Sequence, residues 1–133
     1  MKKLILFKFW LFLGIIFVGV AFFLFLTPVS VKTDIPYLDK LVHFTIYFLL
    51  AWWFVEIFSP SKKIPIFISF FAMGVIIEIL QYFVPGRSFD LWDIAANTLG
   101  NMMAIVLLNF FYPLILFRID QALGKLFITK KAI

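Results

Sequence analysis

The sequence predicts an all-α membrane protein, a bundle of four transmembrane helices with both termini in the cytoplasm. The composition, the lengths of the apolar segments and the distribution of Lys and Arg support this prediction. Of the 133 residues, 65% are hydrophobic and 14% charged, against about 45–50% and 25% in soluble domains. A soluble domain of this size still exposes about a third of its unfolded surface and cannot hide 20 Phe, 4 Trp and 4 Tyr. The surroundings must therefore be lipid.

Each predicted helix is an apolar segment long enough to cross a hydrocarbon core of about 30 Å, which takes roughly 20 residues. These segments are residues 4–26, 41–58, 64–84 and 94–117. Proline follows each of the first three, and we expect a kink at Pro113 within the fourth. The tail, residues 118–133, is either a short helix on the cytoplasmic face or a frayed end. We treat residues 1–133 as a single domain.

The orientation follows from the Lys and Arg residues in short loops. The N-terminus, the loop between the second and third segments and the tail hold nine of them, against three in loops 27–40 and 85–93. This places both termini in the cytoplasm. The basic residues behind the net charge of +5 are thus explained by their role in orienting the chain in the membrane. We therefore expect no nucleic acid partner. The absence of cysteine excludes thiolate chemistry.

Polar residues gather in the outer-leaflet halves of three segments. A charge at the centre of a membrane helix costs about 2.5–3.5 kcal/mol on insertion scales, so such residues indicate function. Glu78 lies six residues before Val84 and is therefore about 9 Å deep. We expect catalytic candidates at His43, Glu78 and Asp93. The candidate ligand-binding residues are Asp39, Lys40, His43, Glu78, Gln81, Arg87, Asp90, Asp93 and Asn97.

Several of these residues also have a purely structural interpretation. Asp39 and Asp90 are candidate helix N-caps, and Asn97 and Asn101 are candidate interhelical hydrogen-bonding residues. Arg87 can pair with Asp90 or contact lipid phosphates. The remaining structural expectations are pairing of Glu56 with Lys62 or Lys63, interface anchoring by Trp10 and Trp92, and close helix packing at Gly74, Ala96, Gly100 and Ala104.

A set of polar, glycine and proline residues recurs at spacings that are familiar from one family. It consists of Asp39, Lys40, His43, Phe44, Tyr47, Gly74, Glu78, Gln81, Pro85, Gly86, Arg87, Asp90, Asp93, Asn97 and Gly100. Over roughly residues 34–110 the chain resembles the VanZ-like family of bacterial membrane proteins. The resemblance implies a small multi-pass protein of the bacterial inner (plasma) membrane. The name-giving member is associated with low-level resistance to teicoplanin, a lipid-tailed glycopeptide antibiotic.

We expect the protein to bind an anionic lipid, a lipid-linked head group or a glycopeptide-related ligand from the outer leaflet. Lys40 and Arg87 would then contact phosphate or carboxylate groups. The partners would be membrane lipids or lipid-linked envelope precursors. The sequence leaves open whether the chain forms a homo-oligomer.

The first alternative is an intramembrane enzyme acting on the same head group. We predict no cofactor, but a divalent metal ion stays open, because His and carboxylates are suitable ligands. Those residues are Asp39, His43, Glu78, Asp90 and Asp93. Otherwise, Glu78 and His43 would act as an acid–base pair. The sequence contains no recognised catalytic spacing, so binding ranks ahead of catalysis. The second alternative is a small transporter acting as an oligomer.

Overall fold

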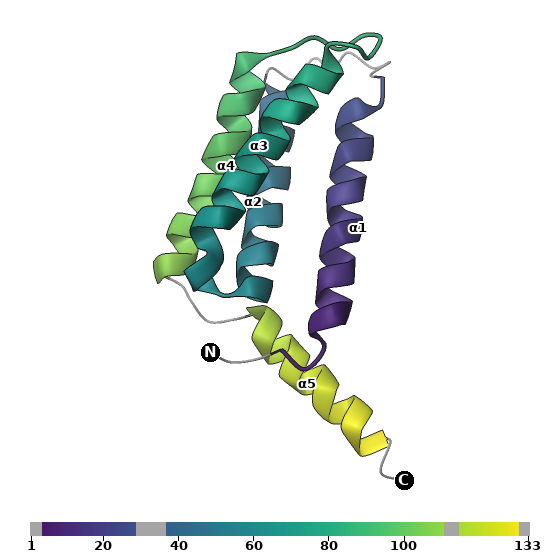
Figure 1. Cartoon of the computed structure of the whole chain (residues 1–133), viewed down its shortest axis with the longest axis vertical. Helices are drawn as coiled ribbons and strands as arrows, with labels where there is room; N and C mark the ends of the chain where they lie inside the picture. Colours follow the sequence, from purple (N-terminus) through teal and green to yellow (C-terminus); the bar gives the residue numbers. More distant parts are fainter. Residues whose placement is uncertain (1–3, 29–36, 111–114, 131–133) are drawn as a thin grey trace.

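The protein is a helical bundle in the computed structural model, which describes residues 4–28, 37–110 and 115–130 (Figure 1). Four helices stand side by side along the long axis, and a fifth extends beyond one end. The elements are α1 (Phe7–Leu26), α2 (Leu38–Phe58), a short 3-10 helix η1 (Pro60–Lys62), α3 (Lys63–Gln81), α4 (Leu91–Phe110) and α5 (Ile115–Lys130).

Four helical segments of the described chain are long and apolar enough to cross a membrane: α1, α2, η1 with α3, and α4. The 20 residues of α1 rise about 30 Å, which matches the hydrocarbon core. Large apolar side chains point outward along these helices, such as Phe12, which is 60% exposed, and Phe23, which is 70% exposed. Lipid is the environment that such a surface requires, so the prediction of a multi-pass membrane protein is confirmed.

The predicted helix boundaries need correction by several residues. Helix α2 begins at Leu38 rather than at residue 41, after Tyr37 in a left-handed backbone conformation. Helix α1 begins at Phe7 rather than at residue 4, and α3 ends at Gln81 rather than at residue 84. The apolar composition continues across the start of α1 and the end of α3, and therefore gives no sign of these ends. The first turn of α2 contains Asp39 and Lys40, so an apolar segment begins only after it.

The fourth predicted span, residues 94–117, combines parts of two helices. Helix α4 begins at Leu91 and ends at Phe110, and Ile115 starts the separate helix α5. The expected kink at Pro113 lies outside the described residues. A proline at 113 has no N–H to donate to the carbonyl of residue 109, which explains a helix end near Phe110. Of the two interpretations of the tail, the helical one is confirmed for residues 118–130.

Helices α2 and α4 make the most extensive contact in the bundle and run in the same direction. A Cβ atom added at Gly100 of α4 would lie 2.1 Å from the backbone oxygen of Phe44 in α2. Only glycine permits this approach, so the predicted close packing at Gly100 is confirmed. The close contact draws the polar residues of α2 and α4 together.

Both described ends of the chain lie at the same end of the bundle (Figure 1). The buried carboxylate of Asp120 in α5 accepts hydrogen bonds from the backbone N–H groups of Ile5 and Leu6, at 2.6 and 2.8 Å, and from the indole N–H of Trp10, at 2.8 Å. Trp10 is only 5% exposed, so its expected role as an interface anchor is wrong. Trp92 is 74% exposed, as such an anchor requires.

Substitution of Gly100 by alanine is expected to lower the melting temperature in detergent, because the α2 and α4 backbones must separate to admit the methyl group. Overpacking of this kind costs about 1–3 kcal/mol. Gly19→Ala is the matched control, since a Cβ there meets nothing within 4 Å. Thermal unfolding followed by circular dichroism measures both. Equal melting temperatures for the two variants would contradict the close contact.

Candidate functional site

The polar residues of α2, α3 and α4 converge at the end of the bundle opposite the described chain ends, as the sequence predicts. His43 of α2, Glu78 of α3, and Asp93 and Asn97 of α4 are all buried, with exposed fractions between 0% and 7%. Lys40 lies one turn before His43 and nearer the end of the bundle. We call these five residues, together with Asp39 and Asp90, the polar cluster.

Lys40 is surrounded by three carboxylates. Its Nζ lies 2.8 Å from Oδ2 of Asp39, 2.5 Å from Oδ2 of Asp90 and 2.6 Å from Oδ1 of Asp93. The hydrogen bond from Lys40 holds the pKa of Asp90 below its ordinary value of 3.8. The positive charge of Lys40 is therefore already compensated within the cluster, and more than compensated if all three acids are ionised.

The two predicted N-caps have different outcomes. Oδ1 of Asp90 accepts a hydrogen bond from the N–H of Trp92, at 2.8 Å, which confirms that Asp90 caps α4. The predicted N-cap at Asp39 is wrong, because α2 begins earlier and Tyr37 occupies that position. Asp39 instead lies in the first turn, where an acid is favourable to the helix dipole.

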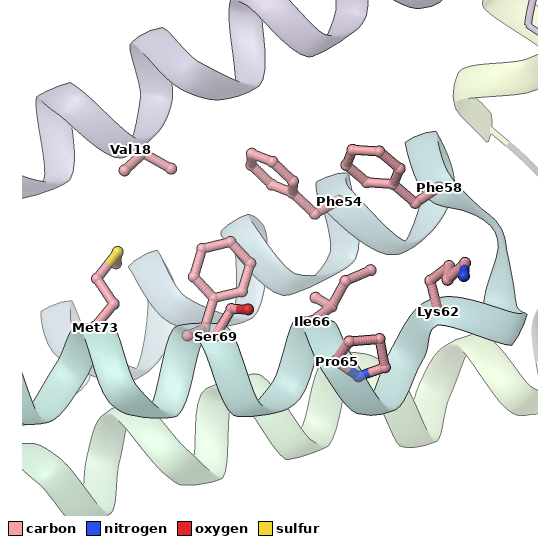
Figure 2. A pocket seen from close by; sticks show the side chains of 9 residues that line it. Val18, Phe54, Phe58, Lys62, Pro65, Ile66, Ser69 and Met73 are labelled. Atoms are coloured by element: carbon pink, nitrogen blue, oxygen red, sulfur yellow. The ribbon is translucent and has the colours of Figure 1, made fainter.

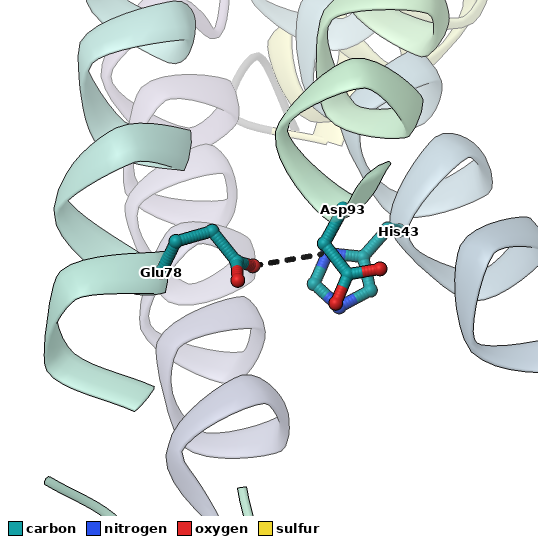
Figure 3. A group of neighbouring side chains, drawn as sticks. All are labelled: His43, Glu78 and Asp93. Atoms are coloured by element: carbon teal, nitrogen blue, oxygen red, sulfur yellow. Dashed lines mark ion pairs between the residues drawn. The ribbon is translucent and has the colours of Figure 1, made fainter. Parts of the chain in front are cut away.

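His43, Glu78 and Asp93 form an inner triad (Figure 3). The Nδ1 atom of His43 lies 3.8 Å from Oε1 of Glu78, and its Nε2 atom lies 3.6 Å from Oδ2 of Asp93. Nδ1 also donates a hydrogen bond to Oδ1 of Asn97, at 3.0 Å. This bond joins α2 to α4, so the interhelical role predicted for Asn97 is confirmed. Three different helices thus bring one imidazole and two carboxylates together.

Glu78 is buried although it lies only three residues, about 4.5 Å, before the end of α3. The rise of about 9 Å is counted along a helix that reaches Val84, and it needs correction because the helix stops at Gln81. The segment after α3 covers the side chain instead, since the N–H of Asp90 donates to Oε2 of Glu78, at 3.2 Å. The other oxygen, Oε1, has no hydrogen-bond partner among the described residues.

Gln81 and Arg87 do not bond to the carboxylates of the cluster within the described chain. Gln81 Nε2 donates to the backbone oxygen of Phe25, at 2.9 Å, and the guanidinium of Arg87 donates to those of Leu24 and Thr27, at 3.3 Å. These carbonyls lack helical partners because α1 ends there. Of the two structural interpretations of Arg87, the pairing with Asp90 is therefore wrong, and the contact with lipid phosphates stays a prediction. Gln81 and Arg87 both fasten the end of α1.

Two further side chains belong beside the cluster, and their sequence positions gave only weak signals. The ring of Phe25 stacks on His43, with centroids 4.2 Å apart. The hydroxyl of Tyr47, one turn from His43, is buried without a hydrogen-bond partner among the described residues. It lies next to Gly74, as does the unpartnered Nδ2 of Asn97. Tyr47 is among the residues that carry the family resemblance, but nothing in the sequence predicted that Phe25 would contact His43.

Two polar residues outside the cluster have structural roles. Asn101 Nδ2 donates to the backbone oxygen of Phe67, at 3.0 Å, which confirms its interhelical role. The predicted pairing of Glu56 with Lys62 or Lys63 is wrong. Glu56 accepts instead from the indole N–H of Trp52, at 2.8 Å, and from the N–H of Leu116, at 2.6 Å.

Among the described residues, two groups of side chains have the geometry to hold a metal ion. One is the inner triad, and the other consists of Asp39, Asp90 and Asp93. In each group, one ligand atom from every residue lies within 4.8 Å of the others. The second group already surrounds the ammonium of Lys40, so the inner triad is the one whose centre is not taken by a cation.

A comparison with known families matches residues 2–112 to the family described as VanZ/LLP1. An uncharacterized protein of Schizosaccharomyces pombe is 38% identical over 82 residues, which are 59% of this chain and 50% of that protein. The chain thus spans about half the length of the curated relative that it matches. No solved structure matches the chain.

Replacement of Lys40 by methionine is expected to destabilise the protein by about 2 kcal/mol. A fully buried pair loses about 3–5 kcal/mol, but the Lys40 side chain is 22% exposed, and water screens part of the interaction. The loss should shrink below about pH 4, because the stabilising contribution of Asp90 is complete above its unfolded pKa of 3.8 and disappears as the pH falls through its lower folded pKa.

Melting temperatures at pH 7, 5 and 3 measure this difference. Lys63→Met is the matched control, since Lys63 Nζ donates to the neutral side chain of Asn109. An equal loss in the two lysine variants at pH 7 would contradict a special role for Lys40.

Proposed function

This chain belongs to the VanZ/LLP1 family, and we propose that it binds a membrane phospholipid or a lipid-linked envelope precursor in the outer leaflet. The phosphate of the ligand contacts Arg87 beside the polar cluster, and an acyl chain lies along the seam between α1 and α3. The observation that carries this proposal is an apolar crevice in the same seam. The crevice begins about 12 Å below the end of α3, and the partly exposed Arg87 follows that helix end.

The crevice has a volume of about 540 Å³, within the range of ligand pockets. Figure 2 shows α1 on one side of it, α3 on the other and aromatic side chains of α2 between them. Its lining is almost entirely apolar and consists of Val18, Phe54, Phe58, Lys62, Pro65, Ile66, Ser69, Phe70 and Met73. An acyl chain is the ligand whose chemistry matches such a lining.

The crevice reaches Met73, which lies eight residues, about 12 Å, below the end of α3. Arg87 lies in the segment that follows α3 and binds the end of α1, so it stands at the top of the same seam. Within the described chain, its contacts use Nε and Nη2, which leaves Nη1 available. A guanidinium with a free N–H is a good partner for phosphate.

Lys40 has a smaller part in this proposal than the sequence indicated. Three carboxylates within 2.8 Å already share its ammonium, so it has little positive charge to offer a phosphate. The ligand therefore meets an acid-rich surface beside Arg87, and binding is strongest for a head group that combines phosphate with a cation.

The orientation and location also belong to the proposal. The described ends of the chain and the Lys62–Lys63 loop lie at one end of the bundle, and we place this end in the cytoplasm because it is rich in Lys. We place the protein in the bacterial inner membrane. The fungal relative has a similar sequence, so a phosphate head group that both kinds of membrane contain is the simplest shared ligand.

Native mass spectrometry of the protein in mild detergent tests the proposal. We expect a retained phospholipid whose occupancy falls at least fivefold in Arg87→Ala and less in Arg87→Lys. Arg118→Ala, in the exposed part of α5, is the matched control and should retain the lipid. Teicoplanin has a polar head and an acyl chain, so it should displace the lipid in the same assay.

Filling the crevice provides an independent arm of this experiment. Ser69→Trp places a large side chain in the crevice and should reduce occupancy, whereas Ile68→Trp, on the neighbouring exposed position, should not. Lys62 lines the opposite end of the crevice. Loss of lipid in Lys62→Ala but not in Arg87→Ala would place the head group in the inner leaflet and overturn the proposal.

A further inference from the structure

The inner triad brings together more hydrogen-bond acceptors than donors. In a neutral imidazole only one nitrogen carries a proton, and Nδ1 of His43 uses it to donate to Oδ1 of Asn97. The other nitrogen, Nε2, then presents a lone pair to Oδ2 of Asp93, 3.6 Å away. Two acceptors that face each other in a buried site repel unless a cation or a proton lies between them.

Glu78 contributes a third acceptor to the same site. Its Oε1 atom is fully buried, lies 3.8 Å from Nδ1 of His43 and has no hydrogen-bond partner among the described residues. A buried polar atom without a partner is costly and rare, which points to a ligand that supplies the missing contact. Figure 3 shows this carboxylate directed toward the imidazole from the opposite helix.

The charge balance around the triad favours the same conclusion. The polar cluster holds four carboxylates (Asp39, Glu78, Asp90 and Asp93) and one ammonium, that of Lys40. The contacts of Lys40 are with the three aspartates, whereas Glu78 accepts from a backbone N–H. Uncompensated negative charge in a low-dielectric site is unfavourable. A divalent cation supplies the compensation that the described side chains do not.

We propose that His43, Glu78 and Asp93 hold one divalent transition-metal ion of the Zn²⁺ or Mn²⁺ class. Nitrogen and carboxylate ligands together suit these ions, whereas Mg²⁺ prefers oxygen ligands alone. Zn²⁺ bonds are about 2.0–2.2 Å long, so small rotations would bring all three ligand atoms, which lie within 4.8 Å of one another, to bonding distance of one ion. Three protein ligands leave a coordination position open to a further group.

This inference deepens the proposed function and rests on it for the role of the ion, which offers positive charge to a phosphate oxygen beside Arg87. The binding of the ion itself depends only on the three side chains. Metal binding is therefore measured in lipid-depleted protein, so that the two proposals can fail separately.

The experiment strips the full-length protein with a chelator in detergent, adds Zn²⁺ or Mn²⁺ alone, removes unbound metal and counts the retained ions by mass spectrometry. We expect one ion per chain and at least a tenfold loss of affinity in Glu78→Gln and in His43→Ala. Asp39→Asn is the matched control, because Asp39 belongs only to the group around Lys40. Equal losses in Asp39→Asn and Glu78→Gln would overturn the assignment to the inner triad.

A second measurement uses the unaltered protein and needs no variant to fold. Co²⁺ added to the stripped protein should give the visible absorption bands of a low-symmetry site with nitrogen ligation, and Zn²⁺ should abolish them. Retained lipid together with no bound ion and no Co²⁺ bands would overturn the metal site while leaving the lipid proposal in place. A bound ion without retained lipid would overturn the lipid proposal while leaving the metal site in place.

Discussion

The arrangement of charge at one end of an apolar bundle is the constraint on which the rest of this structure depends. Three helices each bring acids to a place where charges interact strongly and solvation is poor. Lys40 forms ion pairs with three of these acids, and the backbone N–H of Asp90 donates a hydrogen bond to one oxygen of Glu78. The negative charge of the inner triad is not compensated in this way, and we propose that a metal ion binds there.

The packing of the backbones explains how these side chains come within reach of one another. Gly100 lets α4 touch α2 at Phe44, and the same contact sets Asn97 against His43. Gly74 leaves room for the side chains of α2 and α4 at the level of the cluster. Gln81 and Arg87 then fasten the end of α1, whose Phe25 ring covers His43. The site is thus a product of helix packing rather than of one motif.

Much of this arrangement could be predicted, because lipid makes polar residues costly and therefore informative. The number of spans and the meeting of His43, Glu78 and Asp93 follow from apolar length and helical spacing. The exact helix ends cannot be derived from these features, since the apolar composition continues past Gln81 and Phe110. The contact of Asp120 with Ile5 cannot be predicted from the sequence either, because the two residues lie 115 positions apart. The contact of Arg87 with the end of α1 cannot be predicted either, since a sequence shows charges but not the free carbonyls of a helix end.

The protonation state of His43 tests the central claim most directly, because this residue is the sole histidine in the chain. Protein labelled with ¹⁵N-histidine gives one pair of ring resonances without ambiguity, before and after the addition of Zn²⁺. We predict a neutral ring with one protonated nitrogen, and a shift of the unprotonated nitrogen when the ion binds. A ring protonated on both nitrogens, with resonances that Zn²⁺ does not move, would contradict the claim, because an imidazolium would then supply the positive charge itself.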